Sequence, residues 1–247
     1  MKIKIKNEAI ADFLIVFGIL LMMWPITIRV FDKMTVSNSV NDFKKEVVEI
    51  AKERAKERER GDTTDVDNQL KDLDELYQLM KKYNWDLYKN GQEVSDAFSY
   101  ESSSFDLRKY GFKENVVAVL NIPKLNVKLP VYLGTTAENL NKGAAHLTST
   151  SLPLGETNSN VVIAAHRGLV KHQMFRNIDK LEVGDKITLT TIWDFLEYKV
   201  TGKEIISPTD SSKIYIQEGK DMVTLITCHP YRVNTHRYVV YCERTTE

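Results

Sequence analysis

Short runs of β-branched and aromatic residues, separated by turn signals, dominate the second half of the chain. Each run has the length of one strand, and several are apolar throughout, which predicts burial on both faces. Helical patterns in this half are expected only near 136–142 and 173–178. Many short strands with few helices predict a mainly β fold that closes, or nearly closes, into a barrel. The predicted strands are 116–122, 126–134, 160–166, 186–192, 195–206, 222–228 and 237–243.

Three residues with reactive or charged side chains lie at the ends of these runs. His166 ends one run, Cys228 ends another, and Arg237 begins the last. If the last two runs form an antiparallel hairpin, Cys228 and Arg237 lie at the same rim of the barrel. The same pairing sends Cys242 toward the opposite end, so we expect a free thiol at Cys228 rather than a disulfide.

These three residue types suit acyl transfer from a peptide bond. A cysteine thiolate is a strong nucleophile, and neighbouring positive charge increases the thiolate fraction. His166 can protonate the departing amine and then deprotonate the incoming one. Arg237 offers fixed donors for the substrate carbonyl or for the charge that develops on it. Taken singly, each type is also common in structural positions, so the indication comes from their joint placement.

Composition argues against nucleic-acid and metal binding. The 34 basic residues are balanced by 34 acidic residues, whereas nucleic-acid binders usually carry a basic excess. Two cysteines are too few for a disulfide framework, and the five histidines do not cluster with them at the spacing of metal ligands. We therefore expect neither a nucleic-acid partner nor a metal site.

The N-terminus has the pattern of a membrane anchor. Lysines in the first six residues precede an uncharged run at 13–28. With Asp12 and Arg29 tolerated near its ends, the apolar segment extends over 9–31, which reaches the length of about 20 residues that a span requires. The lysines indicate that 1–8 is a cytoplasmic tail, which predicts a single-pass protein of the cell membrane with an extracellular catalytic domain. A cleaved signal peptide is the alternative, although the nearest candidate cleavage site, at 37–39, lies late.

The segment 32–90 is predicted to be a helical stalk. Within 40–60, opposite charges recur at i,i+3 spacing, which favours a solvated helix. A break follows at 61–64, and leucines then recur on one face of a second helix at 65–88. That face is expected to pack on the barrel. The polar segment 91–110 has no clear period, and such a segment is usually a linker.

The sequence from about Tyr83 to Arg244 resembles the sortase family of cysteine transpeptidases. The segment 224–240, TLITCHPYRVNTHRYVV, is similar to the sortase signature Thr-Leu-x-Thr-Cys followed by an arginine nine residues later. AAHRG at 164–168 is similar to the segment that carries the catalytic histidine of sortases. Pilus-assembling class C sortases are matched in particular by 121–136, 143–155 and 175–187.

This resemblance implies that 111–247 forms an eight-stranded closed sortase β-barrel with Cys228, His166 and Arg237 as catalytic residues. It implies that Cys228 cleaves the Thr–Gly bond of a Leu-Pro-x-Thr-Gly-like (LPXTG-like) sorting signal and retains the acyl part as a thioacyl enzyme. In class C enzymes a lysine amine of another pilin then resolves this intermediate. The expected partners are therefore pilin subunits that carry such signals and acceptor lysines. The resemblance also implies that this chemistry needs no metal or organic cofactor.

Class C sortases also carry a lid before the barrel, with an Asp-Pro-aromatic motif over the active site. The matching residues are Asp96, Ala97 and Phe98, within 91–110. The resemblance implies that the aspartate contacts the catalytic arginine and that the aromatic ring covers the cysteine. Alanine replaces the usual proline, which predicts a less rigid lid. The alternative is that this segment is only a loop.

Several further residues near the expected site are candidates for contacting substrate or for supporting the catalytic residues. These are Thr227, His229, Asn234 and His236. By the resemblance, His229 and Arg232 stand where class C sortases often have a small residue and a glycine, so both are expected to influence substrate choice. His229 is also a second group that could titrate beside the nucleophile.

Alternative functions remain open at this point. A housekeeping sortase would attach surface proteins to a peptidoglycan precursor, and a hydrolase would resolve the thioacyl enzyme with water. A non-catalytic, membrane-tethered β-domain would require the three reactive residues to be coincidental.

Many class C sortases have a second membrane span after the barrel. This sequence stops at Glu247, which indicates either a single anchor or a truncated sequence.

Overall fold

The computed structural model describes residues 7–60, 65–168 and 173–245. Its centre is a closed barrel with the strand order β1-β2-β3-β4-β7-β8-β6-β5, which confirms the predicted mainly β fold with eight strands. The strands are β1 (Val116–Ile122), β2 (Val127–Leu133), β3 (Ala144–His146), β4 (Ser159–Ala164), β5 (Lys186–Thr191), β6 (Phe195–Ile206), β7 (Asp221–His229) and β8 (His236–Arg244).

The strands that carry the predicted site meet at neighbouring positions in the barrel. β4 pairs with β7 in parallel, whereas β8 pairs with both β7 and β6 in antiparallel fashion. β4 and β7 are buried almost throughout, as expected for strands with apolar residues on both faces. The C-terminal ends of β4 and β7 and the start of β8 therefore lie at one rim.

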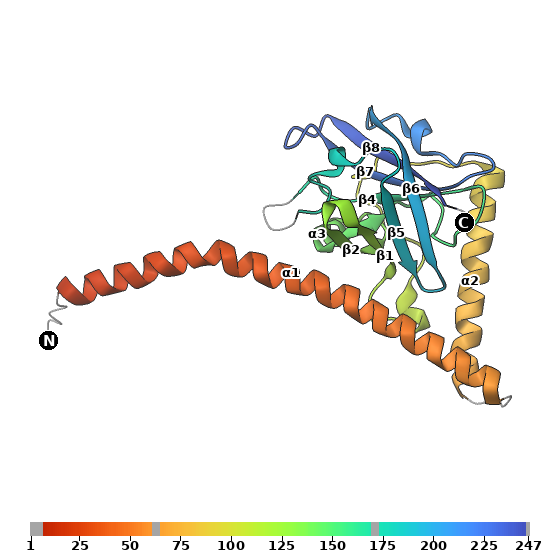
Figure 1. Cartoon of the computed structure of the whole chain (residues 1–247), viewed down its shortest axis with the longest axis horizontal. Helices are drawn as coiled ribbons and strands as arrows, with labels where there is room; N and C mark the ends of the chain where they lie inside the picture. The colour runs from red at the N-terminus through yellow and green to blue at the C-terminus, as the bar shows by residue number, and fades with distance from the viewer. Residues whose placement is uncertain (1–6, 61–64, 169–172, 246–247) are drawn as a thin grey trace.

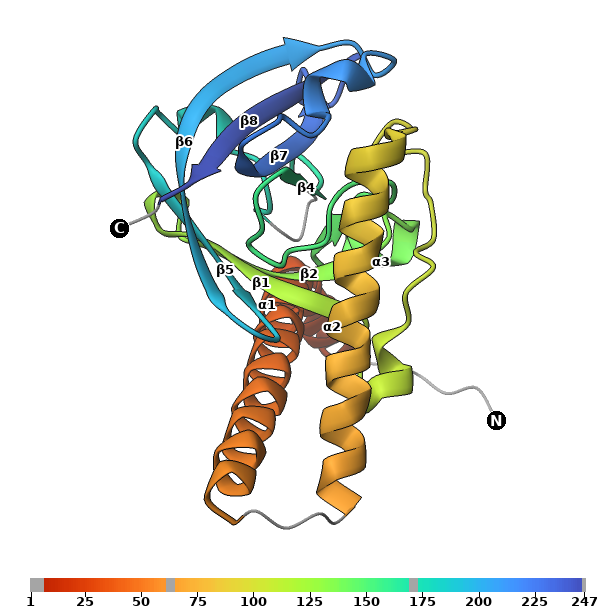
Figure 2. The same cartoon turned by 90° about the vertical axis from the view of Figure 1, so that its right-hand side faces the viewer.

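Two long helices flank the barrel. α1 (Asn7–Arg60) begins well away from the barrel and then runs alongside it, and α2 (Asp65–Asn90) returns to pack on the barrel (Figures 1 and 2). Phe43 of α1 and Leu73 and Leu76 of α2 are among the apolar side chains buried in the same core as the strands. The prediction that one face of the second helix packs on the barrel is therefore confirmed, and that helix ends at Asn90, two residues later than predicted.

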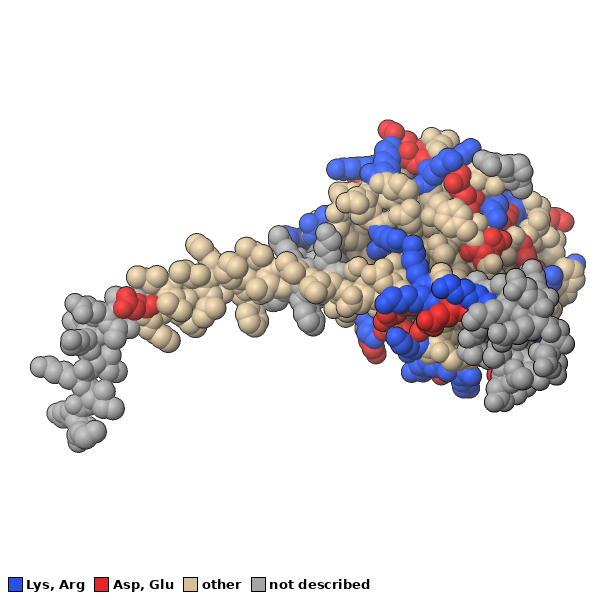
Figure 3. Space-filling view, turned by 60° about the horizontal axis from the view of Figure 1, so that its bottom comes forward, with Lys and Arg blue, Asp and Glu red and all other residues tan. Residues whose placement is uncertain are grey.

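The first helix differs from the prediction, because the anchor segment and the 40–60 stretch belong to one uninterrupted helix. Large apolar side chains along its projecting part are exposed, including Phe13, Met22 and Trp24. Figure 3 shows this part as a largely uncharged rod, whereas charged side chains gather around the barrel. Among the described residues, no helix combines enough length with enough hydropathy to meet the criterion for a membrane span. The anchor at 9–31 stays a prediction.

Three short helical segments flank the first two strands of the barrel. α3 (Ala137–Lys142) confirms the helix predicted near 136–142, and the Thr136 hydroxyl accepts from the Asn139 backbone N–H at 3.2 Å to cap it. The other two are the single 3₁₀ turns η1 (Leu107–Tyr110) and η2 (Pro123–Leu125). A further 3₁₀ turn, η4 (Ser211–Ile214), connects β6 to β7.

The helix predicted at 173–178 is wrong. The chain there forms turns, followed by the 3₁₀ turn η3 (Ile178–Lys180). Met174 has a left-handed backbone with φ of 37°, and the Phe175 N–H donates to the His166 carbonyl at 3.1 Å. This backbone bond ties the segment to the end of β4 and replaces the local bond that a helix would use.

Candidate active site

Strand pairing brings the predicted nucleophile and the predicted arginine to one rim. Cys228 lies opposite Arg237 in the β7–β8 ladder. His166 follows β4 by two residues, and the Thr227 hydroxyl donates to the Ala165 carbonyl at 2.7 Å, which joins the ends of β4 and β7. His166 and Cys228 both line one cavity of about 360 Å³. The lining residues are His166, Arg167, Gly168, Cys228, Tyr231, Arg232 and Asn234.

The second cysteine lies away from this rim, as predicted. Cys242 pairs with Val223 on β7, five positions before Cys228, and with Val200 on β6. Both cysteines are buried free thiols. The antiparallel register therefore excludes a disulfide between them and leaves the Cys228 sulfur available at the rim.

Burial dominates the electrostatics of Cys228. The residue is only 9% exposed, and burial raises the pKa of its thiol above the usual value. The nearby guanidinium of Arg237 opposes this shift, the Asp96 carboxylate reinforces it, and Arg167 opposes it more weakly. At neutral pH the thiol is therefore protonated in this conformation.

His166 is also kept neutral. Burial lowers the pKa of its imidazole below the usual value. The Phe98 ring lies against it, with 5.9 Å between the ring centroids and 31° between the ring planes. The conformation described here thus places a neutral thiol and a neutral imidazole in the lining of one cavity, with an aromatic ring against the imidazole.

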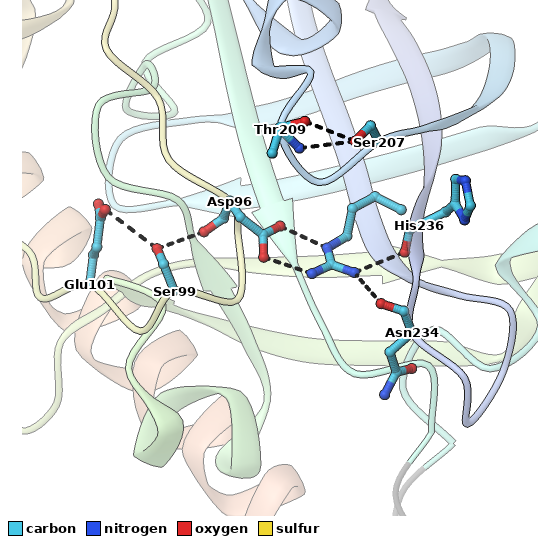
Figure 4. A network of polar contacts seen from close by, with 8 residues as sticks. Asp96, Ser99, Glu101, Ser207, Thr209, Asn234 and His236 are labelled. Carbon is cyan, nitrogen blue, oxygen red and sulfur yellow. Dashed lines mark hydrogen bonds and ion pairs between the residues drawn. The ribbon is translucent and has the colours of Figure 1, made fainter.

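The segment matched to the class C lid holds Arg237. Both Asp96 carboxylate oxygens accept from the Arg237 guanidinium at 2.7 Å, through Nε and Nη2 (Figure 4). Arg237 Nη1 donates to the backbone carbonyls of Asn234 at 3.0 Å and His236 at 2.9 Å. Phe98 lies 5.1 Å from the guanidinium carbon. A guanidinium has five N–H donors, and these contacts occupy four of them.

The lid segment, 91–110, is anchored rather than loose. The Ala97 side chain is 1% exposed and belongs to a small apolar cluster formed mainly by strand residues, including Ala145 and Ile226. The Ser99 hydroxyl donates to the Asp96 carbonyl at 2.7 Å and closes a turn (Figure 4). Further along, Glu101 accepts from the Thr148 hydroxyl, which ties the segment to the barrel. These contacts hold the segment against the barrel, unlike a solvated loop.

The remaining candidate residues have different surroundings. Thr227 is buried and supports the β4 end through its hydroxyl. Asn234 lines the cavity and has a left-handed backbone with φ of 64°, and its carbonyl holds Arg237. His236 contributes its carbonyl to Arg237, while its exposed ring interacts with the Thr235 hydroxyl at 3.0 Å. The exposed ring of His236 therefore does not take part in the contacts that hold Arg237.

His229 is paired with a residue that sequence reasoning passed over. Arg167 Nη1 donates to His229 Nδ1 at 2.6 Å, and Nη2 forms an ion pair with Asp179 at 3.2 Å. The guanidinium also stacks on Tyr238, 5.3 Å from the ring centroid. Burial lowers the pKa of His229, and Arg167 lowers it further, so this imidazole is a neutral acceptor. Arg167 directly follows His166, and that adjacency was the only signal in the sequence.

In the described part of the chain, no three or more His, Cys, Asp or Glu side chains form a group that could hold a metal ion.

Comparison with known proteins identifies similar sequences. Residues 120–245 match the Sortase domain family. Sortase D of Bacillus subtilis (strain 168) is 33% identical over 131 residues, which cover 52% of this chain and 63% of that protein. Sortase A of Bacillus anthracis is 36% identical over 128 residues, which cover 52% of this chain and 59% of that protein. The match thus spans less than two thirds of each of these relatives.

Similar solved structures cover more of the chain. Sortase C1 of GBS Pilus Island 1 superposes with a TM-score of 0.67 at 29% identity, over 86% of this chain and 93% of that one. Sortase C of Streptococcus pneumoniae superposes with a TM-score of 0.68 at 28% identity, over 85% of this chain and 97% of that one. Sortase C-1 of Actinomyces oris superposes with a TM-score of 0.62 at 31% identity, over 80% of this chain and 99% of that one. The likeness therefore includes helices that precede the barrel as well as the barrel itself.

Proposed function

This chain belongs to the sortase family, and on that premise we propose that it is a pilus-assembling cysteine transpeptidase whose nucleophile is Cys228. The observation that carries the proposal is the meeting of Cys228, His166 and Arg237 at one barrel rim, fixed by the pairing of β7 with β4 and β8. The ion pair between Asp96 of the lid segment and Arg237 supports the class C assignment.

The first step is opening of the lid. While Asp96 binds Arg237, the guanidinium has one N–H left for a substrate carbonyl. Departure of Asp96 frees two donors and removes a negative charge that raises the pKa of Cys228. A sorting segment that enters the rim then takes the place of the carboxylate, so that substrate binding and activation of the thiol are coupled.

Acyl transfer follows from the same three side chains. The Cys228 thiol transfers its proton to His166, and the sulfur attacks the threonine carbonyl of the sorting signal. Arg237 stabilises the negative charge that develops on the carbonyl oxygen. His166 then gives its proton to the departing glycine nitrogen as the C–N bond breaks and a thioester remains. Because burial lowers the pKa of this imidazole, its protonated form is a stronger acid and gives up its proton more readily.

A lysine amine of a second pilin completes the cycle. The amine attacks the thioester carbonyl and loses a proton to His166, an isopeptide bond forms, and the Cys228 sulfur leaves and recovers its proton. Water would give hydrolysis at the same point. A housekeeping reaction would instead transfer the acyl group once, to an amine of a cell-wall precursor, and the products distinguish these outcomes.

Incubation with a purified pilin that carries an LPXTG-like signal tests the proposal. We expect a ladder of covalent multimers that survives boiling in detergent and that is absent with the Cys228→Ala variant. Transfer to a single small amine without multimers would contradict pilus assembly. Predominant hydrolysis at high pilin concentration would contradict transpeptidation.

We also propose that 9–31 anchors the chain in the cell membrane, with the barrel outside the cell. The exposed apolar side chains from Phe13 to Ile26 support this proposal, because so much unpartnered apolar surface is costly in water. Alkaline extraction of membranes from expressing cells is the test. The full chain should stay in the pellet and a chain that begins at residue 34 should not, whereas extraction of both would contradict anchoring.

A further inference from the structure

The β7–β8 turn beside the nucleophile holds an arginine in a backbone conformation that favours glycine. Arg232 has φ of 67°. The turn is fixed by backbone bonds, since the N–H groups of Val233 and Asn234 both donate to the Pro230 carbonyl at 3.0 Å. A side chain at such a φ is strained, and glycine would relieve that strain. The position therefore carries a side chain at a cost to the fold, which is typical of functional sites.

The Arg232 side chain packs on a neighbour in the lining of the cavity that contains Cys228. Its guanidinium carbon lies 5.3 Å from the centroid of the Tyr231 ring, and both residues line the cavity. Arg176 also packs on Tyr231, at 5.5 Å, and donates to its hydroxyl at 3.3 Å. Cation–π contact with this ring thus holds the Arg232 guanidinium beside a residue that lines the cavity.

The charges around the cavity are unbalanced. Two of its described lining residues are arginines and none is acidic. Arg167 is paired with Asp179, whereas no carboxylate in the described part of the chain forms an ion pair with Arg232. A planar guanidinium without an internal carboxylate, beside the bond to be cleaved, is suited to bidentate recognition of a carboxylate on the substrate.

We propose that Arg232 is a specificity-determining residue that selects sorting signals with Asp or Glu at the variable position x of Leu-Pro-x-Thr-Gly. This inference rests on the proposed function. Position x is one residue before the threonine whose carbonyl Cys228 attacks, and Arg232 is four residues after Cys228 in a turn that folds back to the same cavity. A carboxylate at x is therefore within reach of the guanidinium while the threonine carbonyl faces the sulfur.

Three fluorogenic peptides with Glu, Gln or Lys at x test the proposal, with the full chain and with its Asp96→Ala variant. We expect kcat/KM for the Glu peptide to exceed that for the Gln peptide about tenfold, the typical value of one charge-assisted contact. The Lys peptide should be slowest, and the preference for Glu should shrink at high salt.

Arg232→Gly is the decisive variant, because glycine suits the backbone of the turn. Its melting temperature should equal or exceed that of the natural chain, while its ratio of Glu to Gln cleavage should fall to within about twofold. Arg232→Lys should retain part of the preference. Arg176→Gln, which leaves Arg232 in place, should retain most of it.

The outcomes separate the two proposals. Cleavage of the Glu and Gln peptides at equal rates by the natural chain would overturn this inference and leave the transpeptidase function standing. Cleavage of none of the peptides by either enzyme would overturn the proposed function and this inference with it. Reduced binding of Arg232→Gly to phosphatidylglycerol vesicles, with unchanged peptide preference, would overturn it in favour of a lipid headgroup contact.

Discussion

The guanidinium of Arg237 is held by both carboxylate oxygens of Asp96, a residue 141 positions earlier in the chain, at 2.7 Å each. Arg237 is 7% exposed, so this ion pair forms where water screens it poorly. It has two consequences for the site. It occupies donors that a substrate carbonyl would use, and it places a negative charge where that charge opposes ionisation of Cys228.

Removal of this contact should expose the nucleophile. Asp96→Ala and Phe98→Ala are each expected to speed labelling of Cys228 by a thiol reagent about tenfold, the effect of a shift of about 1.4 kcal/mol in the lid equilibrium. Cleavage of short sorting peptides should rise with it. Glu93→Ala changes an exposed acid of the same segment and should leave both rates unaltered. Unaltered labelling in both lid variants would show that the segment does not cover Cys228.

The pH dependence of labelling should change in a defined direction. Because the Asp96 charge raises the pKa of the Cys228 thiol, Asp96→Asn should move the midpoint of the rate–pH profile to lower pH. Asparagine nearly preserves the shape of the side chain, so this variant isolates the charge. A midpoint at the same or higher pH would contradict the electrostatic role assigned to Asp96.

Much of the barrel could be predicted from sequence, because its strands are long apolar runs with clear turn signals. The predicted limits of 116–122 and 195–206 coincide with β1 and β6. The meeting of Cys228 with Arg237 followed from the simple geometry of a hairpin. β3 was missed, because a strand of three residues, Ala144–His146, is too short to show a period.

Other features depend on contacts between distant residues and left no local signal. The helical pattern at 173–178 is overridden by the bond from Phe175 to the His166 carbonyl. The pairing of Arg167 with His229 joins segments 62 positions apart. The Asp96 contact was suggested by resemblance to class C sortases alone, since a polar segment without a period predicts only a linker.

Cys242 provides a matched contrast to the nucleophile. It is fully buried between β6 and β7, and Cys242→Ala should cost about 1–2 kcal/mol of unfolding free energy by leaving a small cavity, without loss of activity. Cys242→Ser should cost more, because a buried hydroxyl needs a hydrogen-bond partner. Urea titration and peptide cleavage measure the two properties. Loss of the thioacyl intermediate in Cys242→Ala would contradict its structural role.

His146 should make the fold sensitive to acid. It is buried in β3, its Nε2 contacts the Ser151 carbonyl at 3.0 Å, and burial lowers its pKa to about 4. A depressed pKa stabilises the fold above the usual pKa near 6.5, and this stability is lost as the pH falls toward 4. Between pH 6.5 and pH 4 the free energy of unfolding of the natural chain should fall by on the order of 3 kcal/mol more than that of His146→Gln, given the pKa of about 4.

Denaturant titrations of both proteins at pH 7, 5.5 and 4 measure this difference. Other buried groups, including Asp221, are common to the two proteins, so their contributions cancel in the comparison. Parallel pH profiles for the natural chain and His146→Gln would contradict a neutral His146.

Mass spectrometry of the enzyme trapped with a sorting peptide tests the central claim most directly. In the absence of an acceptor amine, acid quenching should preserve an adduct with the mass of the peptide up to its threonine. Proteolysis should place that adduct on the fragment that contains Cys228, and hydroxylamine should remove it. The adduct should persist in Cys242→Ala and vanish in Cys228→Ala. An adduct on another residue, or unaltered Thr–Gly cleavage by Cys228→Ala, would contradict the account.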